Sequence, residues 1–247
     1  MLSTHQLLAS WRDIVAENRP HASIRIGDVQ AVVAAHEEIL TMRFIERMYA
    51  WADGPYYGLT LPDARARDLL VRALREADYL GVLTQHNWYF RPLSDMVIDH
   101  YGIKPERFFY AFENYYISKL PEFYDMFQDV KVLIVSGKGK TYRAVLERRY
   151  GWKGVVGVVP QWEWDKLDKA RAEMDRHDYQ VALVGAGLAG KILAAHAKET
   201  GHIGLDIGNA VDTCIQSDGD GQMAWDWPEV PRYGWMFGEQ REKPPEE

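Results

Sequence analysis

An aspartate follows an apolar stretch near the N-terminus, in a pattern that could place it beside a ligand. In the segment Arg25-Ile26-Gly27-Asp28-Val29-Gln30, a glycine that permits a sharp turn comes directly before Asp28. This carboxylate could hold a divalent cation, and the cation could bridge the phosphates of a nucleotide. The alternative is that Asp28 caps the following helix, a position in which aspartate is favoured, and spacing alone favours this capping role.

Small residues and lysines follow the long apolar run of the second half, in Ser136-Gly137-Lys138-Gly139-Lys140-Thr141. Small residues leave backbone N–H groups open to a phosphate, and lysines add positive charge. The spacing departs from the nucleoside-triphosphate motif, because Ile134 occupies the position of its first glycine. This run is therefore either a weak anion site or an ordinary turn.

A third glycine-rich turn, Gly185-Ala186-Gly187-Leu188-Ala189-Gly190, matches the G-x-G-x-x-G fingerprint of dinucleotide-binding domains, and Asp206 follows about 20 residues later. This fingerprint normally opens its domain, whereas here only about 40 residues follow Asp206. Close packing of a helix on a strand, with room for a ligand near the backbone, explains these glycines better than a dinucleotide does.

Two carboxylates, Asp206 and Asp212, flank Gly208 and Asn209 in the last part of the predicted core. They could bind a cation or sugar hydroxyls, or one of them could cap the next helix, which spacing slightly favours. The histidines show no metal-ligand spacing and are expected in packing or surface positions (His86, His100, His196). The C-terminal aromatic residues are expected to cover the sheet edge as core (Trp225, Trp227, Tyr233, Trp235, Phe237).

Apolar stretches that alternate with amphipathic segments predict the elements that position these residues. Strands are expected at 22–26, 79–83, 130–135, 154–159, 179–184 and 203–205, and helices at 4–18, 29–35, 63–77, 94–101, 115–127, 141–150, 162–176 and 188–200, with a turn at 217–221. Alternation of strands and helices implies a parallel sheet with right-handed crossovers. The predicted fold class is α/β, a Rossmann-like and mostly parallel sheet with helices on both faces.

The 247 residues predict a single domain, with an N-terminal helix in 1–20, a core in 21–212 and an aromatic-rich tail in 213–247. A formal net charge of −7 gives no support to nucleic-acid or anionic-membrane binding, although a local basic groove stays open. The longest apolar runs are far shorter than the roughly 20 residues that cross a bilayer. With Cys214 as the single cysteine and no apolar signal core, we expect a cytoplasmic protein.

Two segments together resemble a known family. The segment from Ser23 to Gln30 resembles the N-terminal motif of the GT-D-fold glycosyltransferases, in which a strand leads into Asp-x-Glu. The stretch from Val181 through Lys191 to Asp212, with its glycine turn and the strand end Leu205-Asp206-Ile207-Gly208, is similar to their C-terminal block. The order and separation of these two blocks make the resemblance specific, and it spans residues 23–212.

The resemblance implies a domain that binds a nucleotide-sugar, usually a UDP-sugar, and transfers the sugar with help from Mn²⁺ or Mg²⁺. Asp28 and Gln30 would hold the metal, and the catalytic candidates are Asp28, Asp206 and Asp212. The nucleotide-sugar-binding candidates are Arg25, Gly27, Gln30, Ser136, Gly137, Lys138, Gly185, Gly187, Lys191 and Gly208. Gln30 replaces the family's glutamate, which keeps an oxygen but loses a charge and so lowers cation affinity. Val29 replaces the glycine between them.

Several functions stay open at this point. The acceptor would be a hydroxyl of a glycan, a glycoprotein or another molecule, including a modified base in DNA. Gln30 raises a second hypothesis, a nucleotide-sugar-binding protein of the same fold that has lost turnover. The turn from Gly185 to Gly190 with Asp206 raises a third, a nicotinamide-dependent oxidoreductase. Donor sugar, stereochemical outcome and oligomeric state are not specified by the residues.

Overall fold

Seven parallel strands form the centre of the protein, seen here in a computed structural model that describes residues 1–49, 58–87, 89–161 and 163–227. They lie in the order β3-β2-β1-β7-β6-β4-β5, and every neighbouring pair is parallel. The strands are β1 (His21–Arg25), β2 (Tyr79–Val82), β3 (Arg107–Tyr110), β4 (Val132–Ser136), β5 (Val155–Val159), β6 (Val181–Gly185) and β7 (Ile203–Asp206). The predicted α/β class is confirmed.

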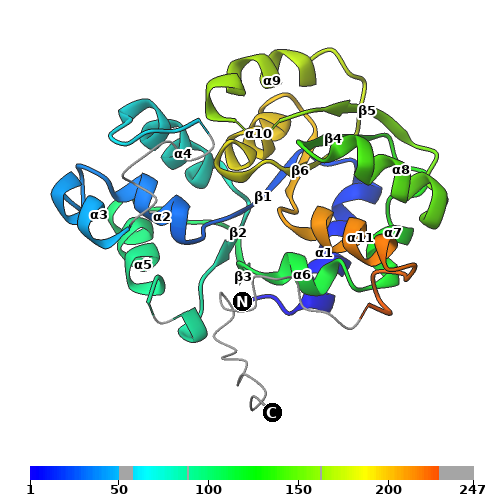
Figure 1. Cartoon of the computed structure of the whole chain (residues 1–247), viewed down its shortest axis with the longest axis horizontal. Coiled ribbons are helices and arrows are strands. Elements are labelled where there is room, and N and C mark those ends of the chain that lie inside the picture. The colour runs from blue at the N-terminus through cyan, green and yellow to red at the C-terminus, as the bar shows by residue number, and fades with distance from the viewer. Residues whose placement is uncertain (50–57, 88, 162, 228–247) are drawn as a thin grey trace, which may run out of the picture.

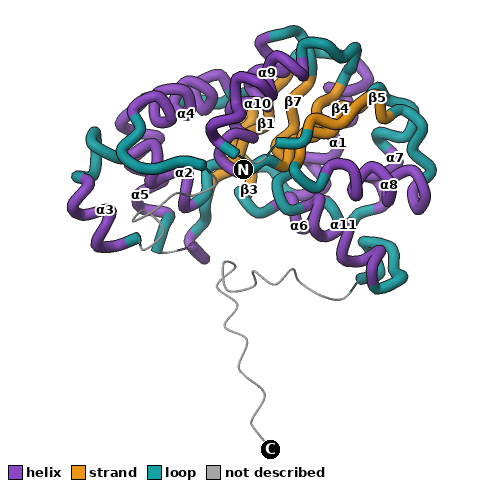
Figure 2. The backbone as a smooth tube through the Cα atoms, turned by 45° about the horizontal axis from the view of Figure 1, so that its top comes forward, coloured by secondary structure: helices purple, strands orange, loops and turns teal. Residues whose placement is uncertain are grey.

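Helices cover both faces of this sheet, so that the strands lie between two helical layers (Figures 1 and 2). One face carries α2 (Asp28–Ala35), α3 (Met42–Met48), α4 (Ala64–Glu76), α5 (Arg91–His100), α9 (Leu167–Met174) and α10 (Gly187–Glu199). The other carries α1 (Thr4–Glu17), α6 (Glu113–Ile117), α7 (Pro121–Asp125), α8 (Gly139–Tyr150) and α11 (Ala210–Gly219). Short 3-10 turns occupy η2 (Gln85–Asn87) and η3 (Trp164–Lys166). No described helix is long and apolar enough to cross a membrane.

Two-sided burial explains why β4 and β6 are apolar along almost their whole length. In β4, Leu133 and Val135 pack under one helical layer, whereas Val132 and Ile134 pack under the other. Fully burying such a side chain stabilises the fold by about 1.5–3 kcal/mol. The clearest apolar run of the sequence is therefore an interior strand of the sheet, between β6 and the edge strand β5.

The structure differs from the sequence prediction in four places. The single helix expected at 115–127 is two short helices, α6 and α7, because Pro121 cannot donate a hydrogen bond and the residue before it is extended. Neither β3 nor α3 was predicted, since β3 is an edge strand with two exposed residues. The helix expected at 162–176 begins as η3 and continues as α9. The turn expected at 217–221 lies partly inside α11, which also runs through residue 212.

The described part of the C-terminal segment packs on helices and not on the sheet edge. The ring centroid of Trp225 lies 5.7 Å from that of Tyr124 in α7 and 5.5 Å from that of Tyr150 in α8. Trp227 is buried, and its Nε1 donates to Asp220 at 2.7 Å. Tyr233, Trp235 and Phe237 lie outside the described residues.

At the amino end of β1, a buried histidine is held neutral. His21 is fully buried, and its Nε2 lies 2.8 Å from Ser23 Oγ, which accepts from Trp11 Nε1 at 2.9 Å. Burial lowers the pKa of His21 to about 4, although the charge of Asp78, 3.4 Å away, acts in the opposite direction. The contact with Asp78 is therefore not an ion pair at neutral pH.

We expect this histidine to make the fold less stable in mild acid. The folded pKa lies below the unfolded value of 6.5, so its stabilising contribution is complete above 6.5 and is lost as the pH falls toward about 4. Between pH 7 and pH 5 the loss amounts to about 2 kcal/mol in the free energy of unfolding. Urea denaturation at the two pH values measures it. His21→Gln should remove this component, whereas His5→Gln, at an exposed position, should keep it.

Candidate functional site

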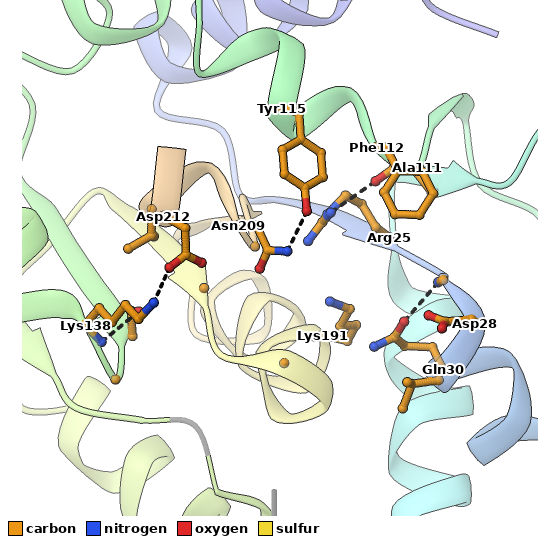
Figure 3. A pocket seen from close by; sticks show the side chains of 18 residues that line it. Arg25, Asp28, Gln30, Ala111, Phe112, Tyr115, Lys138, Lys191, Asn209 and Asp212 are labelled. Atoms are coloured by element: carbon orange, nitrogen blue, oxygen red, sulfur yellow. Dashed lines mark hydrogen bonds and ion pairs between the residues drawn. The ribbon is translucent and has the colours of Figure 1, made fainter. Parts of the chain in front are cut away.

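A cavity of about 390 Å³ opens at the carboxyl edge of the sheet (Figure 3). Its walls come from the residues that follow β1, β3, β4, β6 and β7, as expected for a ligand site in a parallel sheet. The lining includes Arg25, Gly27, Asp28, Gln30, Ser136, Gly137, Lys138, Gly185, Gly187, Lys191, Gly208 and Asp212. The structure thus brings every candidate site residue of the sequence to this cavity except Asp206, which lies beneath its wall.

Asp206 is the anionic centre of a buried cluster. It is 2% exposed, its Oδ1 accepts from Arg25 Nη2 at 2.9 Å, and its Oδ2 lies 3.0 Å from Lys191 Nζ. Burial alone would raise the pKa of Asp206, but Arg25 and Lys191 outweigh it and hold the pKa below its usual value. Burial lowers the pKa of Lys191, against the opposing charge of Asp206. Both oxygens of this carboxylate are therefore occupied by cations of the protein.

Arg25 joins this cluster to the far wall of the cavity. Its Nη1 donates to the Ala111 carbonyl at 3.1 Å and to Asn114 Oδ1 at 2.7 Å, just after β3. Gly208 packs directly on the guanidinium, because a Cβ at this position would lie 1.9 Å from Arg25 Nη2. Gly208 also has φ +45°, which further favours glycine there.

Asp28 does not cap its helix, so the capping alternative is wrong. Gly27 is the N-cap residue of α2, and Asp28 is the first residue inside the helix. Gln30 instead closes the helix start, since its Oε1 accepts from the Gly27 N–H at 3.0 Å. The Asp28 carboxylate lies beside Gln30 at the same end of the cavity (Figure 3).

At the other end of the cavity, Lys138 and Asp212 form an ion pair (Figure 3). Ser136 Oγ accepts from the Lys138 backbone N–H at 3.2 Å, which shapes the turn between β4 and α8. Asp212 lies in the first turn of α11, whose N-cap residue is Asn209, so Asp212 is not the cap either. A lysine and a carboxylate from distant segments thus meet at the opening.

The glycine fingerprint serves packing in this protein. A Cβ on Gly190 would lie 3.3 Å from Val184 Cγ1, which confirms the close approach of α10 to β6. Gly187 has φ +54° and lines the cavity. In a dinucleotide site, the acidic residue at the position of Asp206 would bind ribose hydroxyls. Here that carboxylate is enclosed by Arg25 and Lys191, so this role is not available to it.

Sequence reasoning missed an aromatic part of the wall. Phe112 and Tyr115 line the cavity, and Tyr115 Oη accepts from Asn209 Nδ2 at 2.6 Å. Phe112 follows β3, an edge strand whose pattern does not stand out in the sequence. Asn209 could have been found from its place directly after Gly208.

The expected Mn²⁺ or Mg²⁺ at Asp28 and Gln30 can be judged from the contacts of these residues. Hard cations need several oxygen ligands, preferably charged ones. The side-chain oxygen of Gln30 already accepts from Gly27, and Lys191 adds positive charge to the same cavity. Within the described ranges, no three His, Cys, Asp or Glu side chains gather as metal ligands would. The residues therefore do not fit a two-carboxylate cation site.

Comparison with known proteins relates the chain to one fold. The GT-D fold-like domain matches residues 2–214. Among solved structures, a glycosyltransferase (DUF1792) from Streptococcus sanguinis is 15% identical with a TM-score of 0.56, covering 95% of this chain and 96% of that chain. Another, the domain of unknown function 1792 with a distinct glycosyltransferase fold, is 12% identical with a TM-score of 0.55, covering 93% of this chain and 92% of that chain. At these identities the likeness establishes the fold. No curated protein matches the chain.

We expect the buried cluster around Asp206 to contribute far more to stability than the Lys138–Asp212 ion pair does. Asp206→Asn leaves two buried cations without their anion and should lower the free energy of unfolding by about 3–5 kcal/mol. Asp212→Asn breaks a pair whose lysine is exposed and should cost at most about 1 kcal/mol. Urea denaturation of both variants measures the difference, and equal losses would contradict this account of the cluster.

Proposed function

Because the chain belongs to the family of GT-D fold-like domains, we propose that it is a glycosyltransferase whose donor is a nucleotide-sugar, most simply a UDP-sugar. The observation that carries this proposal is the cavity at the carboxyl edge, where Arg25, Lys138 and Lys191 meet Asp28 and Asp212. Cations suit a diphosphate, and carboxylates suit hydroxyl groups. The description of its structural relatives as a glycosyltransferase and a glycosyltransferase fold supports the same assignment.

The transfer requires a stabilised leaving group and an activated acceptor. In the proposed reaction, the acceptor oxygen bonds to the anomeric carbon while the bond from that carbon to the diphosphate breaks. UDP leaves with the bonding electrons, and positive charge at Lys191 and Lys138 stabilises it. Asp28, which faces the cavity and caps nothing, receives the acceptor proton. The acceptor would be a hydroxyl of a glycan or glycoprotein.

The other two carboxylates receive different roles in this proposal. Asp206 is a positioning residue, because it is buried under the wall and holds Arg25 and Lys191 in place. Asp212 lies at the opening and sets the position of Lys138. Neither therefore competes with Asp28 for the acceptor proton.

A second candidate is a protein of the same fold that binds the nucleotide-sugar without turnover, which the replacement at Gln30 favours. Binding alone does not separate it from an active enzyme, so release of UDP must be measured. The nicotinamide-dependent alternative has lost its main support, because Asp206 is enclosed. The net charge of −7 gives a DNA acceptor no support.

Donor binding is tested first by thermal unfolding with UDP, UDP-glucose, other nucleotide-sugars and NADH. A ligand that binds the folded state raises the Tm, by an amount that grows with ligand concentration over Kd. We expect a rise with UDP and with at least one UDP-sugar, and none with NADH. No rise with any nucleotide-sugar would overturn the proposed function.

The role of Asp28 is tested by Asp28→Asn, which keeps the shape of the side chain and removes its basicity. Loss of a general base should lower kcat about a hundredfold or more. The Tm rise with UDP should remain, because the side chain is not needed to hold the diphosphate. Asp13→Asn, at an exposed position on α1, is the matched control and should keep full activity. Full activity of Asp28→Asn would remove this residue from the mechanism.

A further inference from the structure

We infer that the Lys191 ammonium, in place of a divalent cation, supplies the main positive charge that holds the donor diphosphate. This inference rests on the proposed function and goes beyond it, because it fixes how the leaving group is neutralised. The residues at the start of α2 do not fit the cation that the resemblance implies, whereas Lys191 and the buried cluster bring positive charge to the same cavity.

The start of α2 offers a cation one carboxylate instead of two. Gln30 holds the third position of the helix, and its oxygen accepts from the Gly27 N–H at 3.0 Å. An amide that is fixed in this way caps the helix and brings no charge to the cavity. Asp28 alone is a weak site for Mn²⁺ or Mg²⁺, whose protein sites use several oxygen ligands.

Lys191 occupies the place where positive charge is needed. Its side chain is 6% exposed yet lines the cavity, and Figure 3 shows it between Asp28 and Gln30 on one side and Lys138 with Asp212 on the other. An ammonium carries three donors. Among the described residues, Asp206 is the one ion-pair partner of Lys191, which leaves donors for a ligand in the cavity.

The buried cluster carries an excess of positive charge. Arg25 and Lys191 share a single carboxylate, Asp206, so the three groups together bear one net positive charge. The bonds to Asp206, Ala111 and Asn114 use four of the five N–H donors of Arg25, whereas the ion pair with Asp206 uses one of the three donors of Lys191. This positive charge would repel a divalent cation placed at Asp28, whereas it would attract a diphosphate.

The start of α10 adds to the same field. Lys191 lies just over one turn into this helix of 13 residues, and Ala186 at its N-cap makes no side-chain cap bond. Free N–H groups and the positive end of the helix dipole favour an anion there. Gly185 and Gly187 leave the approach to these groups open, since both line the cavity.

The experiment measures UDP binding by titration calorimetry, in EDTA and in MnCl₂. For the unaltered protein we expect Kd values that agree within about twofold in the two buffers. Lys191→Met should weaken binding about tenfold or more, which corresponds to about 1.4 kcal/mol. Lys191→Arg, which keeps the charge, should restore most of the affinity. Lys169→Met, an exposed lysine on α9, is the matched control and should bind as the unaltered protein does.

A second variant tests the inference without disturbing the cluster. In Gln30→Glu, a carboxylate can still accept from Gly27 N–H, so the helix start is preserved. We expect this variant to bind Mn²⁺ in the presence of UDP, seen by electron paramagnetic resonance, and to bind UDP about tenfold more tightly with Mn²⁺ than without it. The unaltered protein should show no such Mn²⁺ signal.

The possible results separate this inference from the proposed function. UDP binding by the unaltered protein only when Mn²⁺ is present would overturn the inference and leave the glycosyltransferase proposal standing. Full affinity of Lys191→Met, or no gain of Mn²⁺ binding in Gln30→Glu, would also overturn it. Absence of UDP binding in both buffers would overturn the proposed function, and the inference would fall with it.

Discussion

The buried ion pairs of Asp206 with Arg25 and Lys191 are the constraint on which the site depends. Removing charged groups from water costs several kcal/mol per ion, so the cluster is stable only while each charge has its partner. Its members come from β1, β7 and α10, and Arg25 also reaches the carbonyl of Ala111 after β3. The cluster therefore fixes the relative positions of most segments that form the cavity, and a shift of any of them would leave a buried charge unpaired.

The sheet explains why such a cluster can exist where it does. Parallel strands end at one edge, and that edge receives the residues following β1, β4, β6 and β7. Glycine at position 208 lets the Arg25 guanidinium lie flat against the backbone beyond β7, since a side chain there would collide with it. Asp206 and Lys191 are 2% and 5% exposed, so water screens their charges weakly, which strengthens the electrostatic effect of the cluster on a ligand.

Much of this arrangement follows from the sequence. Apolar runs mark β4 and β6 because both faces are covered, and the segments around Asp28 and Gly208 predict that polar residues gather after the strands. The sequence does not reveal that Asp206 is enclosed, because its two partners lie 181 and 15 positions away and spacing carries no information on such contacts. β3 was not predicted because it is an edge strand with exposed residues, which lack a clear apolar pattern. The break in the helix before Pro121 was not predicted because the aromatic residues around it have helical spacing.

In the proposed function, position 30 and Lys191 together let the protein itself supply the positive charge that a bound cation would otherwise bring. A glutamate and a glutamine at position 30 can both accept from the Gly27 N–H, so either residue gives α2 the same backbone conformation at its start. The electrostatic field of the cavity does differ, because glutamine lacks the negative charge with which a glutamate would attract a metal ion. Lys191 still contributes a positive charge to the same cavity. A fixed ammonium, unlike a dissociable ion, is held in place before the ligand arrives. In the proposed reaction, the diphosphate would therefore bind to a charge that was already removed from water when the chain folded, which is the electrostatic preorganisation that leaving-group stabilisation requires.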